Sequence, residues 1–276
     1  MLPRRLLFAT AAAFAGGLSP APAQEWLEPA HRDYLINRFA PPPGYLRIAV
    51  PDGRFGAWLR ALPLKPPGAP ILLYNGQPRG TQGGAAAIVD IDVGRSDLQQ
   101  CADAIIRLRA EYLRASGRGH ALAFRFTNGE RFAYSDYLSG RRPTVRGNSI
   151  TWASTRTSSD SRPAFRAWLD IVFTYAGTVS LAGELLRVAD ATTIGPGDVL
   201  IQPGSPGHAI IAVDVAERES DGARVAMFAQ SFMPAQSIHV LRGPMAGAWY
   251  PISGSAEIDT PDWRFATADL RRFPPA

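Results

Sequence analysis

The sequence contains a single cysteine, Cys101, and a single lysine, Lys65. One cysteine excludes an internal disulfide, so we expect a thiol that is either reactive or buried as a small apolar side chain. With lysine so rare, the basic pI of about 9.7 comes from arginine. No run of basic residues forms a stripe, and nucleic-acid binding is therefore not expected.

Histidines and cysteines at metal-ligand spacing are also missing, which excludes a zinc site of that kind. We expect neither a metal nor a cofactor. The stretch Gly204-Ser205-Pro206-Gly207 is not a phosphate loop, because no lysine follows it. His120 and His239 have no partner at a regular spacing, and the sequence predicts a structural role for both.

The first residues are typical of a secretory signal peptide. Two arginines precede an apolar run at 6–18, and a small-residue cleavage pattern ends at Ala23, which predicts a signal peptide at 1–23. The apolar run is too short to cross a bilayer, so we expect no stable membrane insertion. Residues 24–276 are predicted to form one globular domain in the periplasm or outside the cell, after Sec or twin-arginine export.

Hydrophobic periodicity predicts an α+β fold with a mainly antiparallel sheet packed with helices. The predicted helices are 56–62, a long helix between Ser96 and Gly117, 162–175 and 180–188. The predicted strands are 45–50, 71–74, 85–93, 120–127, 131–134, two within 195–214, 224–230 and 237–241. Residues 139–161 are expected to form a long loop, and 243–276 to be loop-like.

The long helix has the clearest pattern. Ser96 is its predicted N-cap and Gln99 completes a capping box, which places Cys101 about one turn inside. Cys101 also lies on the apolar seam of this helix. Arg107 is predicted to pair with Asp103 and Glu111 on the opposite side, at i,i+4 spacing.

His208 lies between a Gly-Pro turn and an apolar strand, a rigid position that suits a base. A hairpin with its tip near residue 220 places His208 roughly opposite Ser231, so Gln230 and Ser231 are its predicted neighbours. Near the start of a helix, the dipole favours the thiolate of Cys101. A thiol hydrolase requires these parts: a nucleophile, a base, and a polar group that fixes the tautomer of the base.

The order of these elements, with Gly197-Asp198 leading one strand and Gly207-His208 the next, resembles the papain-like cell-wall peptidases of the NlpC type over 89–230. The resemblance implies a papain-like architecture and a cell-wall peptide as substrate. It also implies that Cys101 is the nucleophile, His208 the base and Gln230 the orienting group. In that family the cysteine lies in the first turn of its helix, which differs from the position predicted here.

Three longer stretches resemble the secreted bacterial family called domain of unknown function 4846, over 40–268. They are Asp-Ile-Asp-Val-Gly at 90–94, Asp-Leu-Gln-Gln-Cys-Ala-Asp at 97–103 and Gly-Ser-Pro-Gly-His-Ala at 204–209. This resemblance implies no particular activity.

Three functions therefore stay open. The first is an exported amidase or peptidase that uses Cys101, His208 and Gln230. The second is a non-catalytic domain of the same fold that binds a peptide or glycan, with Cys101 in the core. The third is a carboxylate site of Asp90, Asp92 and His208.

Asp90 and Asp92 share one strand face. They are predicted to bind substrate together with Ser231, or alternatively to pair with arginines. The sequence does not determine the oligomeric state.

Overall fold

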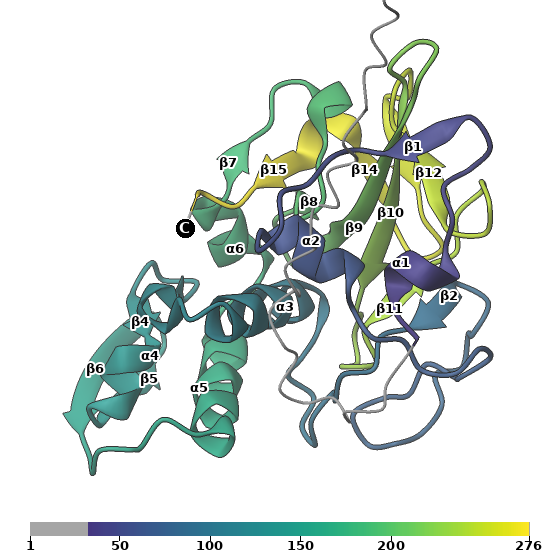
Figure 1. The fold of residues 1–276 in the computed structure, drawn as a ribbon. Coiled ribbons are helices and arrows are strands. Elements are labelled where there is room, and N and C mark those ends of the chain that lie inside the picture. Colours follow the sequence, from purple (N-terminus) through teal and green to yellow (C-terminus); the bar gives the residue numbers. More distant parts are fainter. Residues whose placement is uncertain (1–32, 276) are drawn as a thin grey trace, which may run out of the picture.

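The computed structural model describes residues 33–275, and the signal peptide predicted at 1–23 lies outside them. The strands of the main sheet are β1 (Tyr45–Arg47), β2 (Ala85–Ile88), β7 (Leu186–Arg187), β8 (Val199–Gln202), β9 (His208–Arg218), β10 (Arg224–Gln230), β11 (His239–Leu241), β12 (Trp249–Pro251) and β15 (Leu270–Arg272). They form one nine-stranded sheet in the order β2-β11-β10-β9-β8-β15-β7, with β1 on β9 and β12 on β10 (Figure 1). Every pairing in this sheet is antiparallel, which confirms the predicted α+β class.

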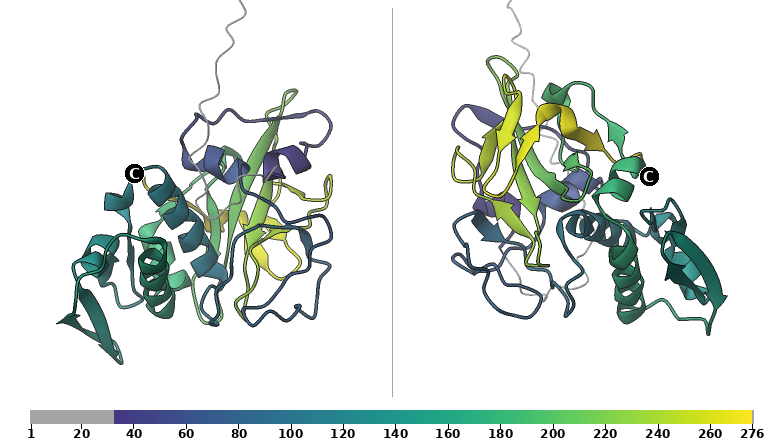
Figure 2. Two further views of the ribbon diagram at one scale, coloured as in Figure 1. Left: turned by 60° about the horizontal axis from the view of Figure 1, so that its bottom comes forward. Right: turned by 180° about the vertical axis from the view of Figure 1, so that it is seen from behind.

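Helices Phe55–Arg60 (α2), Cys101–Ala115 (α3) and Thr178–Glu184 (α6) pack on one face of the main sheet, and residues 252–265 pack on the other (Figure 2). The helices are α1 (Leu35–Arg38), α2 (Phe55–Arg60), α3 (Cys101–Ala115), α4 (Tyr134–Leu138), α5 (Arg162–Tyr175) and α6 (Thr178–Glu184), with short 3-10 turns at Gly119–Ala121, Ala191–Thr193 and Thr267–Asp269. Side chains of β9 alternate between the two cores. Ala209 and Ile211 pack with α3, whereas Ile210 and Ala212 pack with Phe265 of the C-terminal segment.

A buried ion cluster ties the N-terminal elements to β9. The carboxylate of Asp214 is fully buried and accepts hydrogen bonds from Arg47 at 2.6 Å and Arg60 at 2.5 Å. Two hydrogen-bonded guanidinium groups satisfy this charge, which would otherwise be costly to bury. Asp214 therefore holds β1 and α2 on the sheet.

The expected loop at 139–161 is instead largely a hairpin. Strands β5 (Arg141–Arg146) and β6 (Ser149–Ser154) pair in register, with Pro143 opposite Trp152. The sequence does not indicate this hairpin. Most residues of the hairpin are exposed and polar, so the alternation of apolar and polar residues is weak. With β3 (Ala123–Arg125), β4 (Arg131–Ala133), α4 and α5, it forms a smaller group beside the main sheet (Figure 1).

Three further predictions were wrong. The helix predicted at 180–188 ends at Glu184, because Leu186–Arg187 pairs with β15 as strand β7. Residues 71–74 form no regular strand, because Leu72 and Leu73 make only isolated bridges to Pro78 and Gln236. Residues 243–276 are not loop-like, since they contain β12, β13 (Glu257–Asp259), β14 (Arg264–Ala266) and β15. Strands of three residues are too short to show a period in the sequence.

Candidate active site

The structure moves the start of the long helix and therefore the position of its cysteine. Helix α3 begins at Cys101 with Gln100 as N-cap, not at the predicted Ser96. The N–H of Gln100 donates to Asp103 Oδ2 at 3.1 Å. Asp97 is held outside the helix because its carboxylate accepts the N–H of Ala235, at 2.6 Å. Cys101 is thus the first helical residue rather than one turn inside.

The thiol of Cys101 is buried against backbone amides. The residue is 7% exposed, and the backbone N–H groups of Ala102 and Ala209 lie close enough to the sulfur to lower the pKa of the thiol. Burial, followed by the nearby Asp103 carboxyl, raises the pKa of the Cys101 thiol to about 11, although the amides oppose this shift. The thiol is therefore neutral at pH 7. Its contact with Ala209 places it one residue away from His208 along β9.

The imidazole of His208 is fixed through one nitrogen. Its Nε2 lies 2.7 Å from Oε1 of Gln230, and the residue is 1% exposed. Phe232, Trp263 and Phe265 pack on the ring, with centroid distances of 4.8, 5.4 and 5.8 Å. Burial lowers the pKa of His208, an effect that the Gln230 contact and Asp262 reduce only in part. The ring is therefore a neutral imidazole at neutral pH.

Cys101 and His208 meet at the start of β9, but from different sides. Ala209 faces α3, and by alternation the His208 ring lies on the other face, against Phe265. Within residues 33–275, no hydrogen bond joins the thiol to the ring, and His208 Nδ1 has no hydrogen-bond partner there. The structure thus brings Gln230 to His208 directly, and brings Cys101 to the neighbouring peptide group.

A cavity of about 390 Å³ opens beside the cysteine. Its lining includes Cys101, Asp103, Thr178, the turn 204–207 and Met233, which is 50% exposed at the rim. Burial raises the pKa of Asp103 well above its ordinary value, and its Oδ1 is buried without a hydrogen bond among the described residues. A cavity of this size holds a small peptide segment or a sugar.

The amide of Gln230 has two further partners, which the sequence did not reveal. Its Nε2 lies 2.6 Å from Asp262 Oδ2 and 3.3 Å from His239 Nε2. Asp262 in turn forms an ion pair with Arg79. His239 therefore has a partner, Gln230, which its spacing in the sequence does not indicate. His239 on β11 pairs with Gln230 on β10, and this is the part of the arrangement that the order of the strands could have indicated.

Ser231 faces away from His208, toward the start of α3. Its hydroxyl is fully buried and lies 3.0 Å from the carbonyl of Gln99 and 2.9 Å from that of Gln236. Successive strand residues point to opposite faces, which explains why Gln230 rather than Ser231 meets the imidazole. Ser231 thus fastens the segment after β10 to the helix that carries Cys101.

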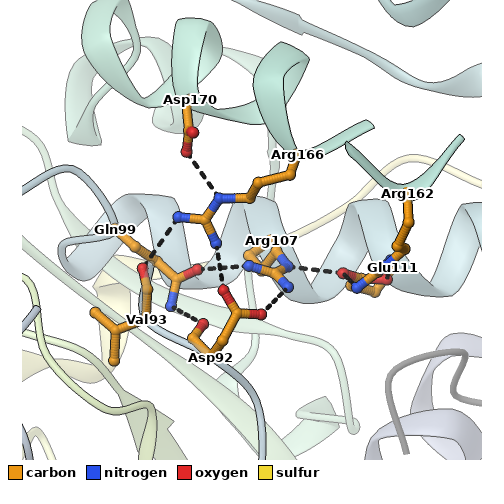
Figure 3. Close-up of polar contacts among 8 residues, drawn as sticks. All are labelled: Asp92, Val93, Gln99, Arg107, Glu111, Arg162, Arg166 and Asp170. Atoms are coloured by element: carbon orange, nitrogen blue, oxygen red, sulfur yellow. Dashed lines mark hydrogen bonds and ion pairs between the residues drawn. The ribbon is translucent and has the colours of Figure 1, made fainter. Parts of the chain in front are cut away.

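Asp92 belongs to an ion-pair network that joins α3 to α5 (Figure 3). Its oxygens lie 2.9 Å from Arg107 and 3.0 Å from Arg166. Burial alone would raise the pKa of Asp92, but Arg107 first and then Arg166 lower it below its ordinary value. Asp92 therefore pairs with arginines, the predicted alternative to a role in substrate binding. Asp90 is half-buried, and neither aspartate lines the cavity at Cys101.

Arg107 is the buried centre of the same network. Its guanidinium lies 2.7 Å from Glu111, which also accepts two hydrogen bonds from Arg162, at 2.6 and 2.7 Å (Figure 3). The predicted pair with Glu111 is confirmed, whereas Asp103 faces the N–H of Gln100 instead of Arg107. The network therefore anchors the smaller group of elements on α3.

Two kinds of feature are absent from residues 33–275, a group of metal ligands and a membrane-spanning helix. In this part of the chain, no three side chains of His, Cys, Asp or Glu are grouped so that they could hold a metal ion. None of the described helices is both long and apolar enough to cross a bilayer.

Comparison with known proteins identifies the family. The model of the family described as domain of unknown function (4846) matches residues 35–272. The chain belongs to this family. No curated protein matches the sequence, and no solved structure matches the fold. The family description names no activity, so the functional conclusion depends on the geometry of the site.

Proposed function

We propose that the protein is a papain-like cysteine hydrolase with Cys101 as nucleophile, His208 as base and Gln230 as the group that orients the base. The proposal depends chiefly on the 2.7 Å contact between His208 Nε2 and Gln230 Oε1. That contact occupies one ring nitrogen and leaves Nδ1 to accept a proton. Because the ring and the thiol lie on different faces of β9, the proposed transfer requires one of the two side chains to rotate toward the other. The thiol itself lies near the backbone N–H of the residue after His208, Ala209, which lowers the pKa of the thiol.

The position of the nucleophile supports the same function. Cys101 is the first residue of α3, as in the NlpC-type peptidases that the sequence resembles. The first N–H groups of a helix have no partner within it. At the start of α3, the N–H groups of Cys101 and Ala102 both lie against the sulfur. They favour the thiolate of Cys101, because N–H donors stabilise the negative charge on the sulfur.

The reaction starts from a neutral pair, since burial raises the pKa of Cys101 and lowers that of His208. His208 Nδ1 takes the thiol proton as the sulfur bonds to the carbonyl carbon of the substrate. The imidazolium gives this proton to the leaving amine or alcohol, and an acyl thioester stays on Cys101. His208 then deprotonates a water molecule that attacks the thioester, releases the carboxylic acid and restores the thiol.

The proposed substrate is a cell-wall peptide or a similar amide, met in the periplasm or outside the cell. The resemblance to NlpC-type peptidases suggests this class, and the predicted signal peptide at 1–23 suggests the compartment. The cavity beside Cys101, about 390 Å³ in volume, has room for part of a stem peptide.

Hydrolysis of purified muropeptides, followed by mass spectrometry, tests the proposal. We expect cleavage of an amide bond by the wild type, an acyl adduct on Cys101, and no cleavage by Cys101→Ala or His208→Ala. Asp92→Asn is the matched control and is expected to stay active, because Asp92 belongs to the Arg107 network. Cleavage that persists in Cys101→Ala refutes the assignment.

One observation favours the alternative, a domain that binds a peptide or glycan without chemistry. The thiol is 7% exposed and its pKa is raised to about 11, as for a cysteine in a core. In that case muropeptides bind the cavity, the wild type cleaves none of them, and Cys101→Ala binds them equally well in titration calorimetry.

A further inference from the structure

A buried chain of polar contacts runs from the carbonyl of Ser237 to the imidazole of His208. His239 Nδ1 lies 2.9 Å from that carbonyl, and His239 Nε2 lies 3.3 Å from Gln230 Nε2. At the far side of the amide, Gln230 Oε1 lies 2.7 Å from His208 Nε2. The three side chains are at most 1% exposed, so each polar atom depends on the next one for its hydrogen bond.

The first link fixes the proton of His239. A carbonyl oxygen only accepts hydrogen bonds, so Nδ1 of His239 must carry the hydrogen that points at Ser237. Burial lowers the pKa of His239 to about 4, and its ring is therefore neutral at pH 7. A neutral imidazole has one N–H group, so Nε2 of His239 is an acceptor and requires a donor from Gln230.

The second link fixes the amide of Gln230. Asp262 offers a carboxylate oxygen 2.6 Å from Gln230 Nε2. Burial alone would raise the pKa of Asp262, but its ion pair with Arg79 and the Gln230 contact lower it, so the carboxylate is an acceptor only. Two acceptors, Asp262 and His239, therefore face the two hydrogens of the amide nitrogen.

The last link fixes the proton of His208. With its nitrogen held by two acceptors, Gln230 can present only its oxygen to the imidazole. An amide oxygen accepts, so Nε2 of His208 must hold the proton and Nδ1 must hold a lone pair. We propose that His239 and Asp262 are positioning residues that hold His208 in this tautomer. Their role in catalysis depends on the proposed hydrolase, but the tautomer itself does not.

Nuclear magnetic resonance of the protein with ¹⁵N-labelled histidine tests this inference. The chain has four histidines, so single substitutions assign the signals. At neutral pH we expect a protonated Nε2 and an unprotonated Nδ1 in the wild-type His208. The double variant with His239→Phe and Asp262→Ala lacks both acceptors and is expected to populate both tautomers of His208. A proton on Nδ1 in the wild type, or an unchanged tautomer in the double variant, overturns the inference.

Two single variants serve as controls. Asp262→Asn keeps an oxygen that can accept from Gln230, so it is expected to preserve the tautomer even though the ion pair with Arg79 is lost. His120→Ala alters an exposed histidine and should leave the His208 signals unchanged. If the double variant does not fold, the wild-type spectrum alone decides, since a proton on Nδ1 of His208 overturns the inference. None of these spectra requires turnover, so a missing hydrolase activity would refute the proposed function and leave this inference standing.

Discussion

Gln230 Oε1 lies 2.7 Å from His208 Nε2, although 22 residues separate the two along the chain. The hairpin of β9 and β10 creates this contact. Its last paired residues, Ile211 and Ala229, continue in register to His208 and Phe232, whose rings are 4.8 Å apart. Gln230 reaches the imidazole diagonally across the strands. The contact therefore follows from local strand pairing, and it gives His208 a fixed orientation.

Alkylation of Cys101 should be slow in the native protein. Burial and Asp103 raise the pKa of the thiol from its ordinary value of 9.0 to about 11, so the thiolate is about a hundredfold scarcer at neutral pH. We expect iodoacetamide at pH 7 to label the native protein at least about a hundredfold more slowly than the urea-unfolded chain. Equal rates, reduced by His208→Ala, would instead indicate a thiolate-imidazolium pair.

Hydrolysis should fail at acidic pH, because the base must be unprotonated. Burial lowers the pKa of His208 below its ordinary value of 6.5, so kcat/KM is expected to fall only below that pH. The negative charge of Asp262 partly opposes this shift. Asp262→Asn should therefore move the acidic limb to still lower pH. An acidic limb above 6.5 in the wild type would contradict a neutral, buried base.

The stability of the fold should depend on the protonation of His239. Its pKa is about 4 in the folded protein against an ordinary 6.5, so the unfolded chain binds the proton first. Stability is then complete above about pH 6.5 and falls by about 3 kcal/mol as the pH drops through about 4. Urea unfolding at several pH values measures this loss, which should be smaller in His239→Gln. An equal pH dependence in both proteins would exclude His239 as the cause.

Removal of Arg107 should destabilise the protein far more than removal of Arg166. Arg107→Met leaves the carboxylate of Glu111 buried with only Arg162 as partner, and we expect a loss of about 3 kcal/mol in urea unfolding. Arg166→Met removes a partly exposed partner of Asp92 and should cost about 1 kcal/mol or less. Similar small losses in both variants would show that the network adds little stability.

The turn before His208 should not tolerate a side chain at Gly207. A Cβ there would lie 2.6 Å from Thr178 Oγ1 and 2.7 Å from backbone atoms of Gly204, so the backbone has to move. We expect Gly207→Ala to cost about 1–3 kcal/mol and to impair hydrolysis, since the turn lines the cavity at Cys101. Gly195→Ala is the control, because a Cβ there meets nothing within 4 Å. Full activity in Gly207→Ala would contradict this role.

Local signals predicted several elements well. Helix α5 has its predicted bounds, Arg162–Tyr175, because the Ser161 side chain caps it and Pro163 suits its first turn. Strand β10 also has its predicted bounds, Arg224–Gln230. In both elements, the apolar period and the flanking residues agree, and tertiary contacts do not oppose them.

Long-range contacts overrode local signals elsewhere. Ser96 and Gln99 satisfy a capping pattern, yet α3 starts five residues after Ser96 because the Asp97 carboxylate binds the backbone of Ala235. Helix propensity cannot anticipate a partner 138 residues away. The hairpin β5–β6 also depends on contacts with a distant part of the chain, because Trp152 packs against Phe126 and Phe132 of another hairpin. Local alternation in the sequence does not reveal such contacts.

The sequence by itself determined the α+β class, the turn that precedes His208 and the hairpin that brings Gln230 to it, because these depend on residues close together in the chain. Only the tertiary structure decided the burial of Cys101, the neutral state of both histidines and the orientation of the Gln230 amide. Asp262 and Arg79 are 183 residues apart in the chain and meet only after folding. Desolvation, which sets the pKa of a thiol or an imidazole, arises from the whole fold rather than from any local pattern.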